Sequence, residues 1–243
     1  MAVATARRLP LALVGATAAA HALPAVLARG PARLLTPGLA GRGRPLGVAL
    51  TFDDGPDPLG TPAILAALDE LGWRATFFLL GTQVRRYPDV ARAVAAAGHE
   101  IAVHGNVHRN HLVRTPQGIR RDIATATAEI ARVTGVQPRF FRPPYGVLTS
   151  GTLWAVRSLG LTPVLWTAWG LDWRAGPAEG VVTEIMRSLW DGGTVLLHDS
   201  DCTSRPGSWR STLAALPLLA AELRARDLAV RTLGDHLERN TTA

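Results

Sequence analysis

Short apolar runs alternate with amphipathic segments from residue 47 to the end of the chain. Short apolar runs are typical of buried strands, whereas apolar residues three and four positions apart are typical of helices. The runs predict strands at 48–52, 75–80, 101–103, 139–141, 163–166, 195–197 and 229–233. The amphipathic segments predict helices at 64–71, 90–97, 119–133, 152–159, 181–189 and 213–226. This alternation predicts an α/β protein with a parallel sheet.

About seven βα units fit two parallel architectures, a closed or nearly closed barrel and an open doubly wound sheet. Periodicity does not choose between them, because the order of strands and helices along the chain is the same in both. In both, the C-terminal ends of the strands lie at one edge of the sheet, and functional side chains gather there. The residues that follow each predicted strand are therefore the candidates for chemistry.

The first 45 residues have a different character. Arg7 and Arg8 precede an almost uncharged stretch over residues 9–28, which is typical of a signal peptide and equally of an uncleaved membrane anchor. A stretch rich in Gly, Pro and Arg follows and indicates a linker. We therefore predict a signal or anchor segment plus linker over 1–45 and one folded domain over 46–243. The expected location is outside the cytoplasm or at the membrane, and the alternative is a cytoplasmic protein with an unpacked extension.

The formal net charge of the 243-residue chain is +7, from 26 basic and 19 acidic residues. Six of the basic residues and none of the acidic ones precede residue 46, so the folded domain is nearly neutral. We therefore expect no nucleic-acid partner. Cys202 is the only cysteine, which excludes an intrachain disulfide and a cysteine-based zinc site. Its own role and the redox compartment stay open.

Polar and aromatic residues follow five of the predicted strands. They are Asp53 and Asp54 after the first strand, His104 and His108 after the third, Arg142 to Tyr145 after the fourth, Trp169 to Trp173 after the fifth, and His198 and Asp199 after the sixth. Because the ends of parallel strands share one edge of the sheet, we expect these residues to converge on one point.

His104 and His108 are four residues apart, a spacing that brings two imidazoles to one metal ion if the chain turns helically after the strand. Of Asp53 and Asp54, one can bind the cation while the other accepts a proton from water, and a purely local acidic turn is the alternative. A His, His, Asp set leaves positions open for water and substrate, as in hydrolytic sites. Zn²⁺ is the first expectation, and Co²⁺, Ni²⁺ or Mn²⁺ can use the same ligands. His111 is a rival ligand, with a surface side chain as the alternative.

Two further side chains suit proton transfer and charge placement at this edge. His198 follows a buried run, and a carboxylate such as Asp172 would keep it protonated and ready to protonate a leaving amine. Arg142 precedes two prolines, which restrict its backbone and suit it to a fixed contact with a carboxylate such as Asp53. Trp166, Trp169, Trp173 and Trp209 are expected near the same strand ends, where their flat faces can stack on sugar rings, although core packing is the expected role of Trp166.

The motifs TFDDGP, HxxxH, RPPYG and LLHD occur in this order between residues 47 and 233. Together they resemble the polysaccharide deacetylase family, also called carbohydrate esterase family four, which includes chitooligosaccharide and peptidoglycan deacetylases. The resemblance implies a distorted (β/α)7-type barrel of parallel strands, which selects the first of the two architectures. It also implies that 46–243 is a catalytic domain that removes N-acetyl groups from the amino sugars of a polysaccharide or oligosaccharide and releases acetate.

The resemblance assigns a role to each candidate residue. It implies Asp53 as the catalytic base beside Arg142, with Asp54, His104 and His108 as the metal ligands and His198 as the acid, tuned by Asp172. The Tyr145 backbone N–H would stabilise the oxyanion, and Pro144, Tyr145, Trp173 and Leu196 would contact the substrate.

Two departures from the family pattern are visible. Gly105 stands where the family usually has Ser or Thr after the first metal histidine, so a loop-fixing hydroxyl is missing and the metal affinity is expected to differ. Trp169 stands where the family often has Asp, which affects substrate contacts more than chemistry.

Three other functions are compatible with parts of the pattern. One is a hydrolase of O-acetyl esters or small amides at the same site. Another is a non-catalytic glycan-binding module, which we expect to have lost the base, the acid or a metal ligand; none is lost here. The third, a nucleic-acid or membrane-surface binder driven by the Arg-rich start, predicts that residues before 47 are essential, whereas we expect them to be dispensable for catalysis. We expect a monomer.

Overall fold

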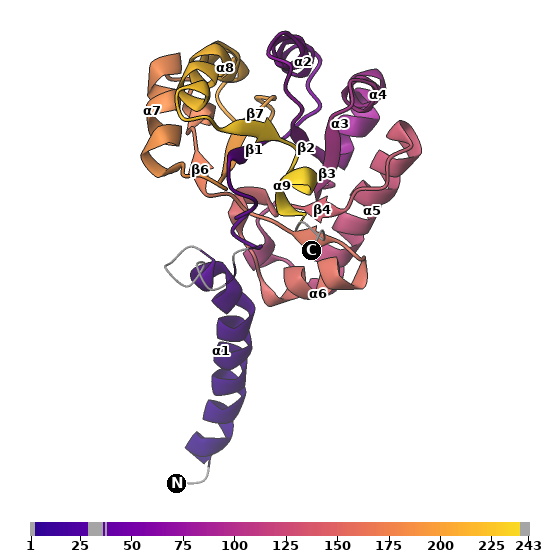
Figure 1. Cartoon of the computed structure of the whole chain (residues 1–243). Coiled ribbons are helices and arrows are strands. Elements are labelled where there is room, and N and C mark those ends of the chain that lie inside the picture. The colour runs from indigo at the N-terminus through magenta and orange to yellow at the C-terminus, as the bar shows by residue number, and fades with distance from the viewer. Residues whose placement is uncertain (1–2, 29–35, 37, 239–243) are drawn as a thin grey trace, which may run out of the picture.

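The computed structural model describes residues 3–28, 36 and 38–238, and its centre is a parallel sheet (Figure 1). The strands are β1 (Gly47–Asp53), β2 (Thr76–Leu80), β3 (Glu100–Gly105), β4 (Phe140–Phe141), β5 (Thr162–Pro163), β6 (Ala168–Trp169), β7 (Thr194–His198) and β8 (Ala229–Arg231). They are arranged in the order β5-β4-β3-β2-β1-β7-β6, and β8 also pairs with β1. All of these strand pairs are parallel, which confirms the predicted α/β class.

The sheet is curled (Figure 1) and remains an open half-barrel, because β5 and β6 form the two ends of the strand order and do not pair with each other. Both strands are only two residues long. The strand expected at 163–166 is shorter because the N–H of Leu165 donates to the carbonyl of Leu39, at 2.8 Å, and not to a neighbouring strand. A segment upstream of β1 therefore contacts the chain between β5 and β6.

Apart from the first and the last, the helices lie around the outside of the curled sheet, and the first projects away from it (Figure 1). The α-helices are α1 (Val3–Leu27), α2 (Gly60–Glu70), α3 (Gly81–Arg86), α4 (Pro88–Ala96), α5 (Pro116–Thr134), α6 (Ser150–Ser158), α7 (Ala178–Ser188), α8 (Trp209–Arg224) and α9 (Leu233–Leu237). The 3₁₀ turns in the described part of the chain are η2 (His111–Val113), η3 (Pro144–Gly146) and η4 (Asp172–Arg174). The six helices predicted within the domain are present, whereas α3, α9 and β6 are too short to give a periodic signal.

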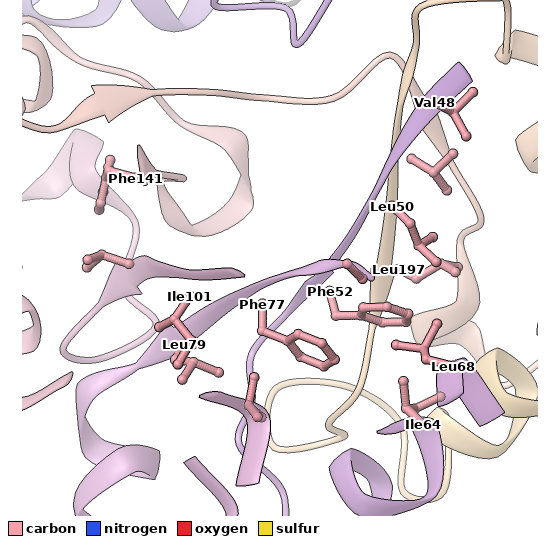
Figure 2. Packing of buried hydrophobic residues seen from close by; sticks show 14 of the residues in the cluster. Val48, Leu50, Phe52, Ile64, Leu68, Phe77, Leu79, Ile101, Phe141 and Leu197 are labelled. Carbon is pink, nitrogen blue, oxygen red and sulfur yellow. The ribbon is translucent and has the colours of Figure 1, made fainter. Parts of the chain in front are cut away.

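Strand β1 is buried along its whole length, so its residues do not alternate between buried and exposed positions. Leu50 and Phe52 face the helices, where Phe52 stacks on Phe77 with ring centroids 5.0 Å apart (Figure 2). Thr51 and Asp53 point to the opposite face, toward Arg142. The two-residue period of the strand thus separates the hydrophobic core beneath the helices from the polar groups that Thr51 and Asp53 contact inside the half-barrel.

Residues before β1 also contact the sheet. The carbonyl of Gly41 accepts a hydrogen bond from the Thr194 hydroxyl at 2.6 Å, and the N–H of Gly43 donates to the carbonyl of Gly192 at 2.9 Å. Part of the stretch expected to be a linker is therefore fixed to the sheet by hydrogen bonds. The assignment of residues 1–45 as a signal or anchor segment stays a prediction.

Among the residues that the structure describes, no helix combines the length and the apolar character needed to cross a membrane.

Candidate metal-dependent hydrolase site

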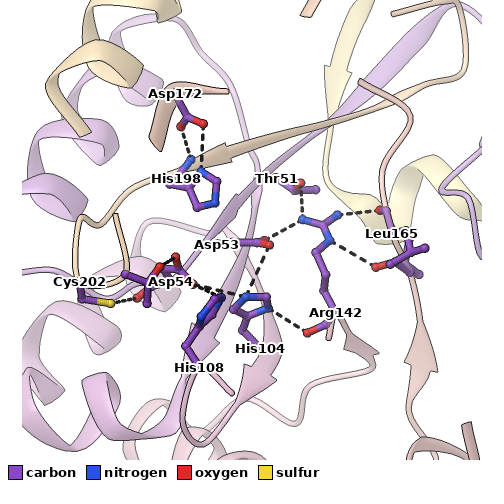
Figure 3. A network of polar contacts seen from close by, with 12 residues as sticks. Thr51, Asp53, Asp54, His104, His108, Arg142, Leu165, Asp172, His198 and Cys202 are labelled. Atoms are coloured by element: carbon purple, nitrogen blue, oxygen red, sulfur yellow. Dashed lines mark hydrogen bonds and ion pairs between the residues drawn. The ribbon is translucent and has the colours of Figure 1, made fainter. Parts of the chain in front are cut away.

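The predicted residues meet at the C-terminal edge of the sheet (Figure 3). Asp53 and His198 are direct neighbours in the register of β1 and β7, and His104 lies near the end of β3. Asp54, directly after β1, has a left-handed backbone with φ of 76°. Parallel pairing alone therefore brings residues far apart in the sequence to one place.

Asp54, His104 and His108 form a cluster that can hold a metal ion. One ligand atom from each lies within 4.8 Å of the others. Oδ1 of Asp54 is 3.3 Å from Nε2 of His104 and 3.6 Å from Nε2 of His108, and it is buried without a hydrogen-bond partner among the described residues. Nδ1 of His104 is 2.9 Å from the carbonyl of Arg142, a contact that holds the proton on Nδ1 and leaves Nε2 as a ligand. These residues fit a divalent cation with two nitrogen ligands and one oxygen ligand.

The protonation states of Asp54, His104 and His108 also suit the binding of a cation. Burial raises the pKa of Asp54, but His104 and the other histidines lower it more, so this pKa lies well below its usual range. Burial lowers the pKa of His108 to about 4. At neutral pH Asp54 is therefore ionised and His108 neutral, the forms that bind cations. Burial lowers the pKa of His104 as well, but Asp53 and Asp54 outweigh it and raise that pKa, so a bound cation would displace a proton.

The turn between the two histidines differs from the helical one we expected. Residues 106 and 107 form a bend, and no helix begins between Gly105 and His111. Gly105 has φ of 103°, and the next N–H, that of Asn106, donates to Oδ2 of Asp122 at 2.8 Å. Asp122 also accepts a hydrogen bond from Arg114 at 3.0 Å. The carboxylate of Asp122 therefore fixes this loop, although the residue after His104 carries no hydroxyl.

Asp53 is held by a fully buried Arg142. The guanidinium donates to Oδ1 of Asp53 at 2.7 Å and to the Thr51 hydroxyl at 2.8 Å (Figure 3). Its remaining donors reach the carbonyls of Val164 and Leu165. The guanidinium is thus fixed on several sides, and it keeps Asp53 in one orientation beside the metal cluster.

His198 is paired with Asp172, which is fully buried at the start of η4. Nδ1 of His198 is 2.9 Å from Oδ1 of Asp172, and Oδ2 of Asp172 accepts hydrogen bonds from the His198 N–H and the Thr212 hydroxyl. Burial lowers the pKa of His198, but the Asp172 carboxylate outweighs this effect and raises it to about 10. His198 is therefore an imidazolium at neutral pH, as expected for a proton donor.

One cavity of about 440 Å³ joins these groups. Its polar lining consists of Asp53, Asp54, His104, His108, His198 and the Thr203–Ser204 pair. Tyr145, Trp173 and Leu196, which we expect to contact the substrate, line it, and the Tyr145 ring meets the His108 ring edge-on at 4.3 Å. Pro144, expected at the substrate, is buried and is not part of the lining. Trp209, at the start of α8, does not line the cavity either.

Several lining residues were not predicted from the sequence. Thr203, in the loop after β7, donates to Oδ2 of Asp54, and the Cys202 thiol beside it lies 3.4 Å from the Asp54 carbonyl. Burial raises the pKa of that thiol to about 11, so it stays neutral. The one local signal that could have placed Thr203 at the site is its position shortly after the LLHD motif. Leu39 and Ala40 also line the cavity, and Leu39 is held there by its hydrogen bond with Leu165, a contact that no local pattern reveals.

His111 is neither a ligand nor a surface side chain, so both alternatives from the sequence are wrong. It is fully buried, and it is not part of the metal cluster. Its Nδ1 is 2.9 Å from the Thr152 hydroxyl, and its ring stacks on Phe141 at 6.1 Å. Burial lowers its pKa to about 3, which keeps it neutral. It joins η2 to α6 and β4.

The family model described as "Polysaccharide deacetylase" matches residues 41–164, which include Asp53, Asp54, both histidines of the cluster and Arg142. The chain belongs to the polysaccharide deacetylase family. This membership and the His, His, Asp cluster together support a divalent metal at the site.

Polysaccharide deacetylases from several bacteria are similar over most of the chain. A chitooligosaccharide deacetylase of Azorhizobium caulinodans is 34% identical, over 76% of this chain and 92% of that protein. A peptidoglycan-N-acetylglucosamine deacetylase of Bacillus cereus is 32% identical, over 76% of this chain and 66% of that protein. The solved structure of the Bc1960 peptidoglycan N-acetylglucosamine deacetylase has a TM-score of 0.75 and 29% identity, and covers 80% of this chain and 90% of that one. The curled parallel sheet with outer helices is thus the fold of this family.

Proposed function

We propose that the chain hydrolyses the N-acetyl groups of amino sugars in an oligosaccharide or polysaccharide such as chitin or peptidoglycan, with Zn²⁺ as its metal. The observation that carries the proposal is that the metal cluster, Asp53 and His198 all line one cavity. Two imidazoles and a carboxylate are a usual ligand set of catalytic zinc. The substrates named for the similar deacetylases support the choice of amino sugars.

Asp53 and the metal cluster together would generate the nucleophile. When bound, the divalent cation supplies a Lewis acid that polarises the acetamide carbonyl and lowers the pKa of water. Asp53 accepts the proton of the attacking water, because Arg142 fixes its carboxylate at the cavity wall and leaves one oxygen free of that contact. The water oxygen forms the new bond to the carbonyl carbon.

His198 and Tyr145 would complete the reaction. The backbone N–H of Tyr145 is proposed to stabilise the charge that develops on the carbonyl oxygen. The imidazolium of His198 then gives its proton to the nitrogen as the carbon–nitrogen bond breaks, and Asp172 stabilises this imidazolium. The products are acetate and a free amino sugar.

Acetate release from chitooligosaccharides, peptidoglycan and acetylated xylan, with and without a chelator, tests the proposal. We expect release from the first two substrates, loss with chelator, and recovery with Zn²⁺. Asp53→Asn should lower the rate about 10²–10⁴-fold, whereas Asp69→Asn, at an exposed position, should not. Release confined to acetylated xylan would instead establish an O-acetyl esterase. Near-normal release by Asp53→Asn would show that the assigned base is wrong.

We further propose that the protein acts outside the cytoplasm or at the membrane, where cell-wall polymers lie. Support comes from Arg7, Arg8 and the uncharged stretch after them. Fractionation of cells that produce the full chain with a C-terminal tag is the test. Recovery in the soluble cytoplasmic fraction alone would contradict this proposal.

A further inference from the structure

One part of the active-site cavity is built by residues that precede the family match. Ala28, Leu39 and Ala40 line the cavity, whereas the family model begins at residue 41. Ala28 and Ala40 are buried, and Ala28 belongs to a small hydrophobic cluster with Leu165. This wall is therefore a property of this chain's N-terminal segment and not of the matched domain.

A continuous apolar track connects this wall to the reacting end of the cavity. Trp173, next to Asp172, stacks on Trp169 with centroids 6.4 Å apart, and Trp169 meets Trp166 edge-on at 5.7 Å. Trp166 in turn packs against the cluster that contains Ala28, Leu165 and Leu39. All of these side chains line the same cavity. We use the name apolar track for Trp173, Trp169, Trp166, Leu165, Leu39 and Ala28. The Nε1 atoms of Trp169 and Trp173 are buried without a hydrogen-bond partner among the described residues, so only the far end of the track has no polar side-chain atom.

Hydrogen bonds connect the far end of the apolar track, through Arg142, to the catalytic carboxylate. The carbonyl of Leu165 accepts a hydrogen bond from Arg142 at 2.9 Å, and the N–H of Leu165 donates to the carbonyl of Leu39 at 2.8 Å. Because Arg142 also holds Asp53, one chain of hydrogen bonds links the base to the wall. The wall is therefore part of the site's rigid frame.

The far end of the track favours an alkyl group over a sugar ring. Ala28, Leu39 and Leu165 have no polar side-chain atom, so a sugar hydroxyl buried against them would lose its hydrogen bonds to water. An alkyl chain there loses no hydrogen bonds, and each buried methylene improves binding about fourfold. The polar groups of a substrate fit the part of the cavity that the metal cluster and His198 line.

We propose that the site accepts N-acyl groups longer than acetyl, with the acyl chain lying along the apolar track. The inference rests on the proposed function and extends it to amino sugars whose N-acyl group is longer than acetyl, such as propionyl, butyryl or hexanoyl. The reaction is the same hydrolysis: the amide carbon–nitrogen bond breaks, the water hydroxyl joins the acyl carbon, and the nitrogen gains a proton. The products are a short fatty acid and the free amino sugar.

The test compares kcat/KM for chitobiose carrying N-acetyl, N-propionyl, N-butyryl or N-hexanoyl groups, measured as free amine. With the full wild-type chain we expect kcat/KM to rise about fourfold for each methylene up to butyryl. Leu39→Asn, which puts an amide into the track, should bring the butyryl-to-acetyl ratio down toward one. Leu46→Asn is the matched control, because Leu46 is 67% exposed and outside the cavity, and it should leave the ratio unchanged.

Two outcomes would overturn the inference: a wild-type butyryl-to-acetyl ratio at or below one, or a ratio that Leu39→Asn leaves unchanged while the variant keeps its wild-type circular dichroism spectrum. In either case hydrolysis of the N-acetyl substrate would still support the proposed function. If no substrate is hydrolysed, the proposed function fails. In that case, calorimetric titration of the zinc-loaded protein with the butyryl and acetyl compounds decides the inference. Tighter binding of the butyryl compound supports it, and equal or weaker binding overturns it.

Discussion

The hydroxyl of Thr203 donates a hydrogen bond to Oδ2 of Asp54, on the side of the carboxylate opposite to His104 and His108. Oδ1 is thereby left as the single free oxygen for a metal ion. Hydrogen bonds that orient a metal ligand are worth about 10–100-fold in metal affinity. We therefore expect Thr203→Val to weaken zinc binding by at least about tenfold, and Thr203→Ser to retain it.

Competition with a chromophoric chelator measures this affinity without reference to activity. The valine side chain has nearly the shape of threonine, so a change in affinity reports the lost hydroxyl. Equal zinc affinity of Thr203→Val and the wild type would contradict the prediction.

Arg142 and Asp53 form a buried ion pair, so replacing the Arg142 side chain with an uncharged one should destabilise the fold. Arg142→Met leaves a buried carboxylate without its partner, and we expect the free energy of unfolding, measured in urea, to fall by about 3–5 kcal/mol. Arg187→Met is the control: its guanidinium pairs with Glu184 at 2.9 Å on the surface, and its loss should cost less than about 1 kcal/mol. Similar losses for both variants would show that Arg142 does not stabilise the interior.

The raised pKa of His198 predicts a pH dependence of activity. If His198 donates its proton, activity is lost as the pH rises through its pKa of about 10. Asp172→Asn removes the carboxylate that outweighs burial, so we expect the alkaline limb of the kcat profile to move toward neutral pH. An unchanged limb in this variant would show that another group sets it.

The same shift predicts a pH dependence of stability. The folded-state pKa lies above the ordinary value of 6.5, so the Asp172–His198 pair stabilises the fold fully below that pH. Its contribution is lost as the pH rises toward about 10. Urea unfolding at several pH values should therefore show a decline over this range that is absent in Asp172→Asn. A decline of equal size in that variant would contradict the assignment.

Restoring a hydroxyl after the first metal histidine should harm this protein. Gly105 has φ of 103°, which L side chains rarely adopt, and a Cβ added there would lie 3.1 Å from Oδ2 of Asp122. We expect Gly105→Ser to destabilise the fold by about 1–3 kcal/mol. Gly72→Ser is the matched control, because it also has positive φ but nothing within 4 Å, and it should cost less. Chemical denaturation measures both, and an equal cost would mean that Asp122 makes no difference.

The local sequence determined the strands, the longer helices and the chemistry at the strand ends. Strand β1 could be predicted because a strand buried on both faces must be apolar, and its end carries Asp53 and Asp54. Parallel strands share one edge, so the sequence also predicted that His104, Arg142 and His198 would lie together. These features depend on local periodicity and on connections that all parallel sheets have in common.

Only the tertiary structure decided the features that depend on contacts between distant segments. It placed Leu39 against Leu165, Thr203 against Asp54, and His111 inside the protein. None of these contacts has a local signature, because the free energy that fixes them comes from packing and hydrogen bonds between residues far apart in the chain. A stretch that reads as a linker can therefore form a wall of the active site.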